Sequence, residues 1–188
     1  MSRAIFFSLF VMFVAALPTP GQQQSASAPG WQQAQKSDAG RDTSSRQFTL
    51  AGKYLTKPKS DPGTPPTLVV ACRARGSKGR FSSASVNPGV PLDIEYVEPS
   101  EIKAGNSYYP KVDARYRLDD GKAEKEQWSA GTDKASATFS KSVLEKMLRA
   151  HTVEITVKEF KSGEISMQFD IPDSPQLESA CGVSVRKK

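Results

Sequence analysis

Strict alternation of apolar and polar residues restricts the fold of this chain more than any other feature. Residues 153–158 (VEITVK) and 165–171 (ISMQFDI) each alternate, and Lys161-Ser162-Gly163 lies between them. Successive side chains of a β-strand point to opposite faces, so this pattern predicts two half-buried strands joined as a hairpin. Residues 112–119 (VDARYRLD) alternate in the same way and end at Asp120-Gly121, a strong hairpin signal.

Other short strands are expected from about residue 46 onward. Residues 67–75 (TLVVACRAR) are β-branched and apolar, which is typical of a buried strand. Further strands are expected at 47–55, 80–86, 92–96, 122–128 and 135–139. Because the strands follow one another through hairpins, the sequence predicts a mainly β fold, an antiparallel β-sandwich of about eight short strands.

One amphipathic helix and one short helical turn complete the expected fold. Ser142 and Glu145 fit an S-x-x-E capping box ahead of an apolar stripe, which predicts a helix ending near Ala150. Ser174-Pro175 is expected to open a short C-terminal helical turn that Gly182 ends. The helix is expected to cover one edge or end of the sandwich.

The N-terminus has the order of a secretory signal peptide, which we assign to residues 1–20. Arg3 precedes the apolar run of residues 4–16, and Pro18 and Pro20 follow it. A membrane span needs about 20 apolar residues, so this run is too short for an anchor. The protein is therefore expected to be exported, periplasmic or extracellular, and not embedded in a membrane after cleavage.

Residues 21–45 are rich in Gln and Ser and poor in large apolar residues, so a flexible linker is expected there. Two alternatives remain for Trp31: it docks on the domain, or it stays exposed. The β-sandwich domain is expected to span residues 46–185.

Charge and composition exclude several classes of function. The chain has 26 Lys and Arg, 20 Asp and Glu, one His and two Cys, and its net charge is +6. A modest positive charge suits contact with an envelope protein or an anionic surface ligand. No basic run has interleaved aromatic residues, so no nucleic acid is expected. One His and two Cys cannot supply four zinc ligands, and neither a metal nor a cofactor is expected.

Cys72 lies in the most apolar strand, and Cys181 lies near the C-terminal end of the domain. An even pair of cysteines in an exported protein usually forms a disulfide. The alternatives are two buried free thiols or a redox-active cysteine. A C-x-x-C motif, the usual sign of redox activity, is not present.

Two polar surfaces are candidates for binding. Arg115, Arg117 and Asp119 share the polar face of residues 112–119, and Trp128 on the return strand would stack on an arginine there. The alternative is a solvated face of cross-strand ion pairs with Trp128 in the core.

A second basic cluster surrounds a predicted turn. Arg73, Arg75, Lys78 and Arg80 flank this hairpin. They form either a binding site or a charged edge that deters aggregation.

Several segments resemble the VasI/TagO accessory proteins associated with bacterial type VI secretion. The residues that carry the resemblance are Pro66-Thr67-Leu68-Val69-Val70-Ala71-Cys72 for P-x-L-x-x-x-C, Val112 with Tyr116-Arg117-Leu118-Asp119, Trp128 with Asp133, Phe139 with Leu144 and Leu148, Phe169-Asp170 and Cys181. Trp31 is similar to an early Trp of that family. The resemblance covers about residues 67–182, departs from the family in 76–110, and implies an exported β-rich domain with paired Cys.

Recognisable catalytic motifs are not present: the sequence lacks G-x-S-x-G and H-E-x-x-H. The single His151 is expected to be partly exposed near a helix end, without a catalytic role. The leading hypothesis is therefore a non-enzymatic, exported binding or accessory domain of the bacterial cell envelope. One alternative is an envelope hydrolase with two carboxylates about 5–9.5 Å apart. Another is a structural assembly module that oligomerises through an open sheet edge.

Overall fold

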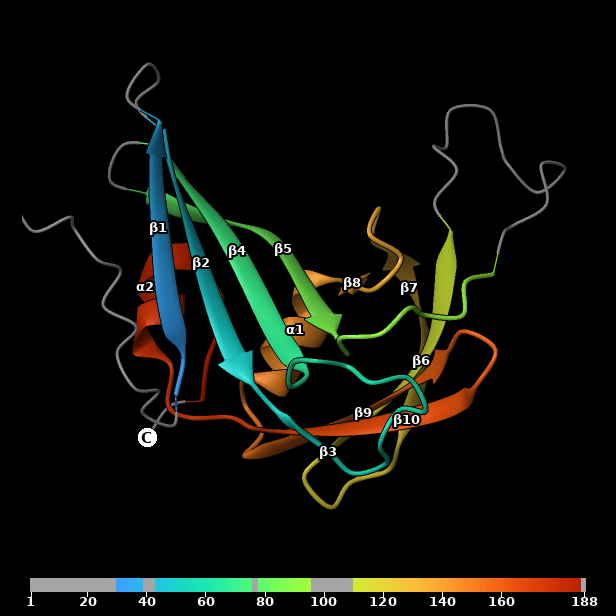
Figure 1. The fold of residues 1–188 in the computed structure, drawn as a ribbon. Helices are drawn as coiled ribbons and strands as arrows, with labels where there is room; N and C mark the ends of the chain where they lie inside the picture. The colour runs from blue at the N-terminus through green and yellow to red at the C-terminus, as the bar shows by residue number, and fades with distance from the viewer. Residues whose placement is uncertain (1–29, 39–42, 76–77, 96–109, 187–188) are drawn as a thin grey trace, which may run out of the picture.

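The computed structural model describes residues 30–38, 43–75, 78–95 and 110–186. The expected signal peptide, residues 1–20, lies outside these residues. In the described part the chain forms ten strands and two short helices, and every strand pairing is antiparallel. The mainly β, antiparallel fold class is confirmed (Figure 1).

The predicted hairpins form with boundaries close to those expected. In chain order, the strands span Gln32–Asp38 (β1), Thr43–Ala51 (β2), Lys53–Tyr54 (β3), Thr67–Arg75 (β4), Lys78–Asn87 (β5), Lys111–Leu118 (β6), Glu124–Ala130 (β7), Ala137–Phe139 (β8), Thr152–Glu159 (β9) and Gly163–Asp170 (β10). The strand expected at 92–96 does not form over its described residues, 92–95. Leu92 and Glu95 make only isolated bridges, to Glu159 and Lys111.

All ten strands belong to one sheet rather than to the two sheets of a sandwich. Its order is β1-β2-β4-β5-β8-β7-β6-β9-β10-β3. The short strand β8 pairs with β5 on one side and with β7 on the other, so it joins two halves that would otherwise be separate sheets. Figure 1 shows that the sheet curls strongly, which lets its two halves face a common interior.

The chain passes from one half of the curled sheet to the other at Gly52. This residue is the only one between β2, which pairs with β4, and β3, which pairs with β10. A Cβ atom on Gly52 would lie 2.6 Å from the Phe169 ring and 2.7 Å from the Gln168 carbonyl oxygen. Only glycine fits such a close approach, so Gly52 lets one continuous segment pair with β4 in one half of the sheet and with β10 in the other.

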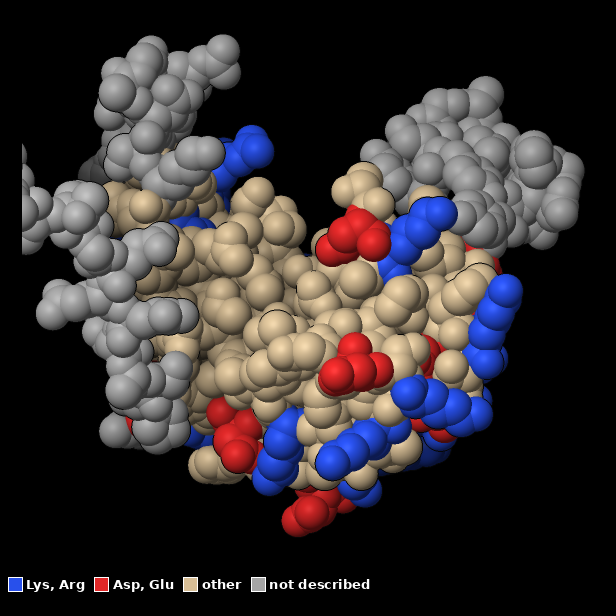
Figure 2. All heavy atoms as spheres, viewed as in Figure 1, with Lys and Arg blue, Asp and Glu red and all other residues tan. Residues whose placement is uncertain are grey.

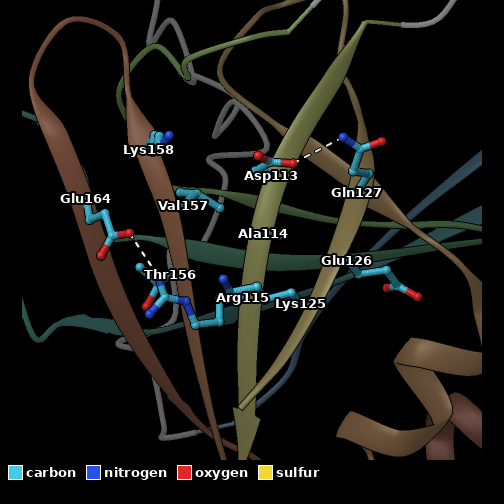
Figure 3. Close-up of a pocket in the computed structure, with 10 residues that line it drawn as sticks. All are labelled: Asp113, Ala114, Arg115, Lys125, Glu126, Gln127, Thr156, Val157, Lys158 and Glu164. Atoms are coloured by element: carbon cyan, nitrogen blue, oxygen red, sulfur yellow. Dashed lines mark hydrogen bonds and ion pairs between the residues drawn. The ribbon is translucent and has the colours of Figure 1, made fainter.

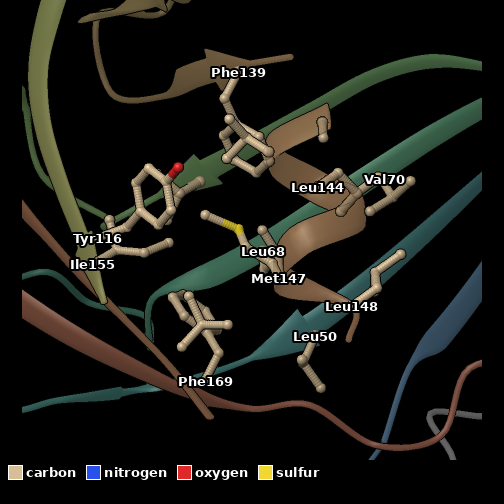
Figure 4. Close-up of a cluster of buried hydrophobic side chains, with 14 of the residues drawn as sticks. Leu50, Leu68, Val70, Tyr116, Phe139, Leu144, Met147, Leu148, Ile155 and Phe169 are labelled. Carbon is tan, nitrogen blue, oxygen red and sulfur yellow. The ribbon is translucent and has the colours of Figure 1, made fainter. Parts of the chain in front are cut away.

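The first helix, α1 (Lys141–Met147), fills the interior of the curled sheet. Its Leu144 and Met147 are fully buried, and Figure 4 shows them among Leu68, Ile155 and Phe169 from both halves. Each of these side chains removes apolar surface from water, so the helix and the sheet stabilise each other. Neither α1 nor α2 (Pro175–Cys181) is long and apolar enough to cross a membrane, as far as the described residues show.

The start of α1 corrects the expected capping box. Ser140, not Ser142, is the N-cap, and its hydroxyl accepts a hydrogen bond from the backbone N–H of Val143. The Glu145 carboxylate accepts instead from the backbone N–H of Ser184, at 2.9 Å. Glu145 therefore holds the C-terminal segment against the helix rather than closing its own N-terminus.

The region expected to be a flexible linker contains a strand. β1 pairs along its whole length with β2, so the folded domain begins well before residue 46. A polar segment can do this because an outer strand needs backbone pairing more than buried side chains. Trp31 docks on the domain: it packs against the core, and its Nε1 donates a 2.7 Å hydrogen bond to the Ser174 hydroxyl.

Cys72 and Cys181 form the expected disulfide, with their Cα atoms 5.2 Å apart. Both residues are buried, and the bond ties the end of α2 to the middle of β4. As expected, Pro175 opens α2, and Gly182 ends it with a positive φ of 62°.

A buried carboxylate fixes the Pro-rich loop that follows β3. Glu159, only 3% exposed, accepts hydrogen bonds from the backbone N–H groups of Lys59 (2.9 Å) and Ser60 (3.0 Å). Burial opposes its ionisation, but the hydrogen bonds from Ser60 and Lys59 outweigh burial and lower the pKa of Glu159 below its ordinary 4.5.

Replacing Glu159 with Gln should lower the free energy of unfolding at pH 7 by about 1–3 kcal/mol, because one of the two backbone N–H groups loses its acceptor and the hydrogen bonds to a charged group are lost. The difference between the two proteins should be complete above the unfolded-state pKa near 4.5 and vanish as the pH falls through the lower folded-state pKa. Urea unfolding at several pH values measures it. Glu154→Gln, which removes an exposed ion pair, should cost less than about 1 kcal/mol. If Glu159→Gln and Glu154→Gln cost the same, Glu159 does not stabilise the loop as described.

Candidate functional site

A groove of about 470 Å³ crosses the outer face of β7, β6, β9 and β10. We call it the charged groove and define it by Asp113, Arg115, Lys125, Gln127, Lys158 and Glu164. Their position on the outside follows from the alternation of β6, whose residues 112, 114 and 116 are buried while 113 and 115 are exposed.

Strand register sets the charges of the groove side by side. Arg115 on β6 lies opposite Lys125 on β7 and opposite Thr156 on β9. Lys158 lies one pleat further along β9, opposite Glu164 on β10. Three strands therefore bring three cations onto one surface and β10 adds Glu164; Figure 3 shows Arg115, Lys125, Thr156 and Glu164 along it.

Only part of this charge is neutralised within the groove. The Arg115 guanidinium lies 2.8 Å from the Glu164 carboxylate, and these side chains are 44% and 52% exposed. Asp113 accepts a 3.2 Å hydrogen bond from Gln127. Among the described residues, neither Lys125 nor Lys158 has a carboxylate within 4.0 Å.

The groove is suited to holding an anion. An exposed ion pair contributes only about 0–1 kcal/mol, so the Arg115–Glu164 pair can open for a competing carboxylate or phosphate. The arginine fork can bind such a group through two N–H donors, and the two lysines add charge on either side.

Arg117 and Asp119, the next residues on the same polar face of β6, are engaged in other contacts. Arg117 forms a cross-strand ion pair with Glu154 on β9. Asp119 accepts hydrogen bonds from the backbone N–H groups of Thr152 and His151, both at 2.8 Å. These bonds, led by that from Thr152, lower the pKa of Asp119. Asp119 thus holds the β6 and β9 ends together.

Trp128 does not lie on the arginine face. It is 2% exposed on the inner side of β7, where its ring centroid lies 4.7 Å from that of Phe139. Its indole N–H donates to Glu126, whose carboxylate points away from the other groove residues in Figure 3. Stacking of Trp128 on Arg115 or Arg117 is therefore wrong, because even-numbered residues of β7 face inward.

A second cluster, absent from the sequence expectations, lies at the inner rim. Glu124 accepts hydrogen bonds from Lys146 (2.8 Å) and from the buried Tyr116 hydroxyl (2.7 Å). Burial and then Glu124 raise the pKa of Tyr116, whereas Lys146 and then Tyr116 lower the pKa of Glu124. In the sequence, the only indication of this cluster is the spacing of Glu124, Glu126 and Trp128, which places the three side chains on one face of the strand.

The basic hairpin forms as expected between β4 and β5. Arg73 lies opposite Arg80, and Arg75 lies opposite Lys78. The side chains of Arg73 and Arg80 are exposed, while those of Arg75 and Lys78 lie outside the described part. Two arginines directly opposite each other repel, which suits an edge or an anion contact equally well.

The single histidine is held by ion-pair neighbours rather than by catalytic ones. His151 is exposed, and its Nδ1 lies 2.7 Å from a guanidinium nitrogen of Arg186, which also pairs with Asp173 at 2.9 Å. The described residues hold no cluster of three or more His, Cys, Asp and Glu that suits a metal ion.

The carboxyl groups with clear pKa shifts do not match a general acid. Asp119, Glu124, Asp133 and Glu159 all have lowered pKa values. A carboxylic acid that protonates a leaving group at neutral pH needs a raised pKa. These four groups therefore act as acceptors that hold structure together.

Comparison with known proteins identifies no relative: no family model matches the chain, nor does any curated protein or solved structure. Among the surfaces of the described residues, the charged groove combines concavity with two lysines, Lys125 and Lys158, that have no carboxylate within 4.0 Å there.

Proposed function

We propose that the protein is an exported, non-enzymatic binding domain of the bacterial cell envelope. In this proposal the charged groove holds a carboxylate or phosphate group of its partner, either an envelope protein or an anionic surface ligand. The observation that carries the proposal is the position of Lys125 and Lys158, which flank Arg115 on adjacent strands without ion-pair partners in the described structure.

The compartment of this proposed function has two supports. The chain begins with a signal-peptide pattern, and the Cys72–Cys181 disulfide suits an oxidising compartment outside the cytoplasm. The resemblance to VasI/TagO proteins extends the proposal to an accessory role beside a secretion system. Secretion-system genes adjacent to this one would support that role.

The double variant Lys125→Glu with Lys158→Glu should lose binding to the anionic partner, because two attractive charges become repulsive. Immobilised wild-type protein should capture either a protein from solubilised envelope extract or vesicles of phosphatidylglycerol but not of phosphatidylcholine. Capture should weaken as salt rises, since exposed charges are screened over about 8–10 Å at 0.1–0.15 M. The two captures distinguish a protein partner from an anionic lipid surface.

Lys57→Glu with Lys134→Glu is the matched control. Both lysines are exposed and lie outside the groove, and the pair of changes alters the net charge equally. The control should keep most of the wild-type binding. Equal loss in both double variants would mean that net charge, not the groove, attracts the partner, and would overturn the proposal.

A further inference from the structure

The strand β1 is one end of the sheet in the described structure. All seven of its residues, Gln32–Asp38, pair in unbroken register with β2. In the described structure no strand pairs with its other side. Such an edge presents backbone N–H and C=O groups to any further strand that can align with them.

The two ends of the sheet differ in their protection. The opposite end is β3, which has two residues and leads into the Pro-rich loop of residues 57–66. Short edges and prolines prevent a further strand from pairing. β1 has no proline, no irregularity in its register and enough length for a full ladder. Its open side is therefore the one suited to pairing.

The strand is self-complementary in one register. Two antiparallel copies of a seven-residue strand overlap completely only when the middle residue, Gln35, lies opposite its own copy. In that register Lys36 falls opposite Ala34, and Asp38 falls opposite Gln32. No like charges then face each other, which would otherwise oppose the pairing.

The outer surface beside the middle of β1 carries little charge, and the exposed Arg73 and Arg80 lie on the next cross-strand row, which starts at Lys36. The cross-strand row that starts at Ala34 continues through Gln47, Ala71 and Ser83, and all four are uncharged. Figure 2 shows a largely uncharged surface over β2, β4 and β5, whereas Lys, Arg, Asp and Glu gather over the other half of the molecule. Two copies joined at β1 would bring the uncharged halves together and keep the charged grooves apart.

We propose that two copies of this chain join through β1, antiparallel and with Gln35 at the two-fold axis, to form one continuous sheet. This symmetric contact is closed, so it ends at a dimer. The interface is separate from the charged groove, and each can exist without the other. A dimer would carry two grooves, which strengthens binding to a surface that displays repeated anions.

The test uses substitutions at the two-fold axis. Gln35→Lys and Gln35→Glu each place two like charges opposite each other, so each should raise the dimer dissociation constant about fivefold. An equimolar mixture of Gln35→Lys and Gln35→Glu should instead form a heterodimer whose dissociation constant is lower than that of either homodimer, because opposite charges then face each other. Sedimentation velocity over a concentration series gives the masses, and ion-exchange chromatography separates the three dimers by their net charge.

Gln47→Lys and Gln47→Glu are the matched controls, because Gln47 is an exposed glutamine one strand further in. They should leave the dissociation constant unchanged. Arg46 lies opposite Gln35 within the chain, so unfolding midpoints of all four variants check that β1 stays in place. A wild-type protein that keeps the mass of one chain at every concentration overturns the proposal. The proposal is also overturned if the mixture of Gln35→Lys and Gln35→Glu has a dimer dissociation constant no lower than that of either variant alone.

Discussion

Replacing Cys72 and Cys181 together with alanine should lower the free energy of unfolding by about 3–5 kcal/mol. The bond links residues 109 positions apart, and a crosslink of that span removes much entropy from the unfolded chain. It also anchors α2, whose Leu177 and Ala180 are buried against the sheet. Urea unfolding of the oxidised wild type and the double variant measures the difference.

Reduced wild-type protein is the control for this prediction. If the crosslink itself supplies the stability, reduced wild type and the double alanine variant should unfold at similar urea concentrations. The single variants Cys72→Ala and Cys181→Ala should each lose nearly the full amount, because either change removes the bond. A loss below about 1 kcal/mol in the double variant would contradict a stabilising role.

Replacing Trp128 with alanine should cost about 3–5 kcal/mol, as is typical for a fully buried aromatic side chain. The indole packs between Phe139 and Tyr116 on the inner side of β7, and its N–H bonds to Glu126. Thermal or urea unfolding measures the loss. The cavity that Trp128→Ala would leave lies on the side of the sheet opposite the charged groove.

Trp128→Phe separates the core role from a binding role. It keeps an aromatic ring in the same space and should therefore cost much less than Trp128→Ala. Anion binding by this folded variant should match the wild type, because Trp128 lies on the face opposite Arg115. If Trp128→Phe stays folded but no longer binds the partner, Trp128 contributes to binding and this assignment to the core alone is wrong.

The secondary structure was predictable where the signal is local. The alternation of residues 112–119 and 153–171 sets which side chains face inward, and the turns at Asp120-Gly121 and Ser162-Gly163 join neighbouring strands. The disulfide followed from the cysteine count and the expected compartment. None of these features depends on which distant segments of the chain pair with each other.

The remaining features depend on partners far away in the chain. β1 is too polar to be recognised alone, and it becomes a strand because β2 offers a free edge. Lys125 and Lys158 belong to one groove only because β6 lies between their strands. The face of Trp128 follows from its register with Val112, which sequence alternation in β7 (EKEQWSA) does not reveal.

The turn at Gly52 determines when the fold can be completed. Lys53 and Tyr54 pair with Gln168 and Met167, so the segment that continues from β2 cannot pair with the other half of the sheet until almost the whole chain is present. Contacts between such distant residues form slowly and late. For the exported protein that we propose, this order means that the sheet cannot be completed before nearly the whole chain has crossed the membrane.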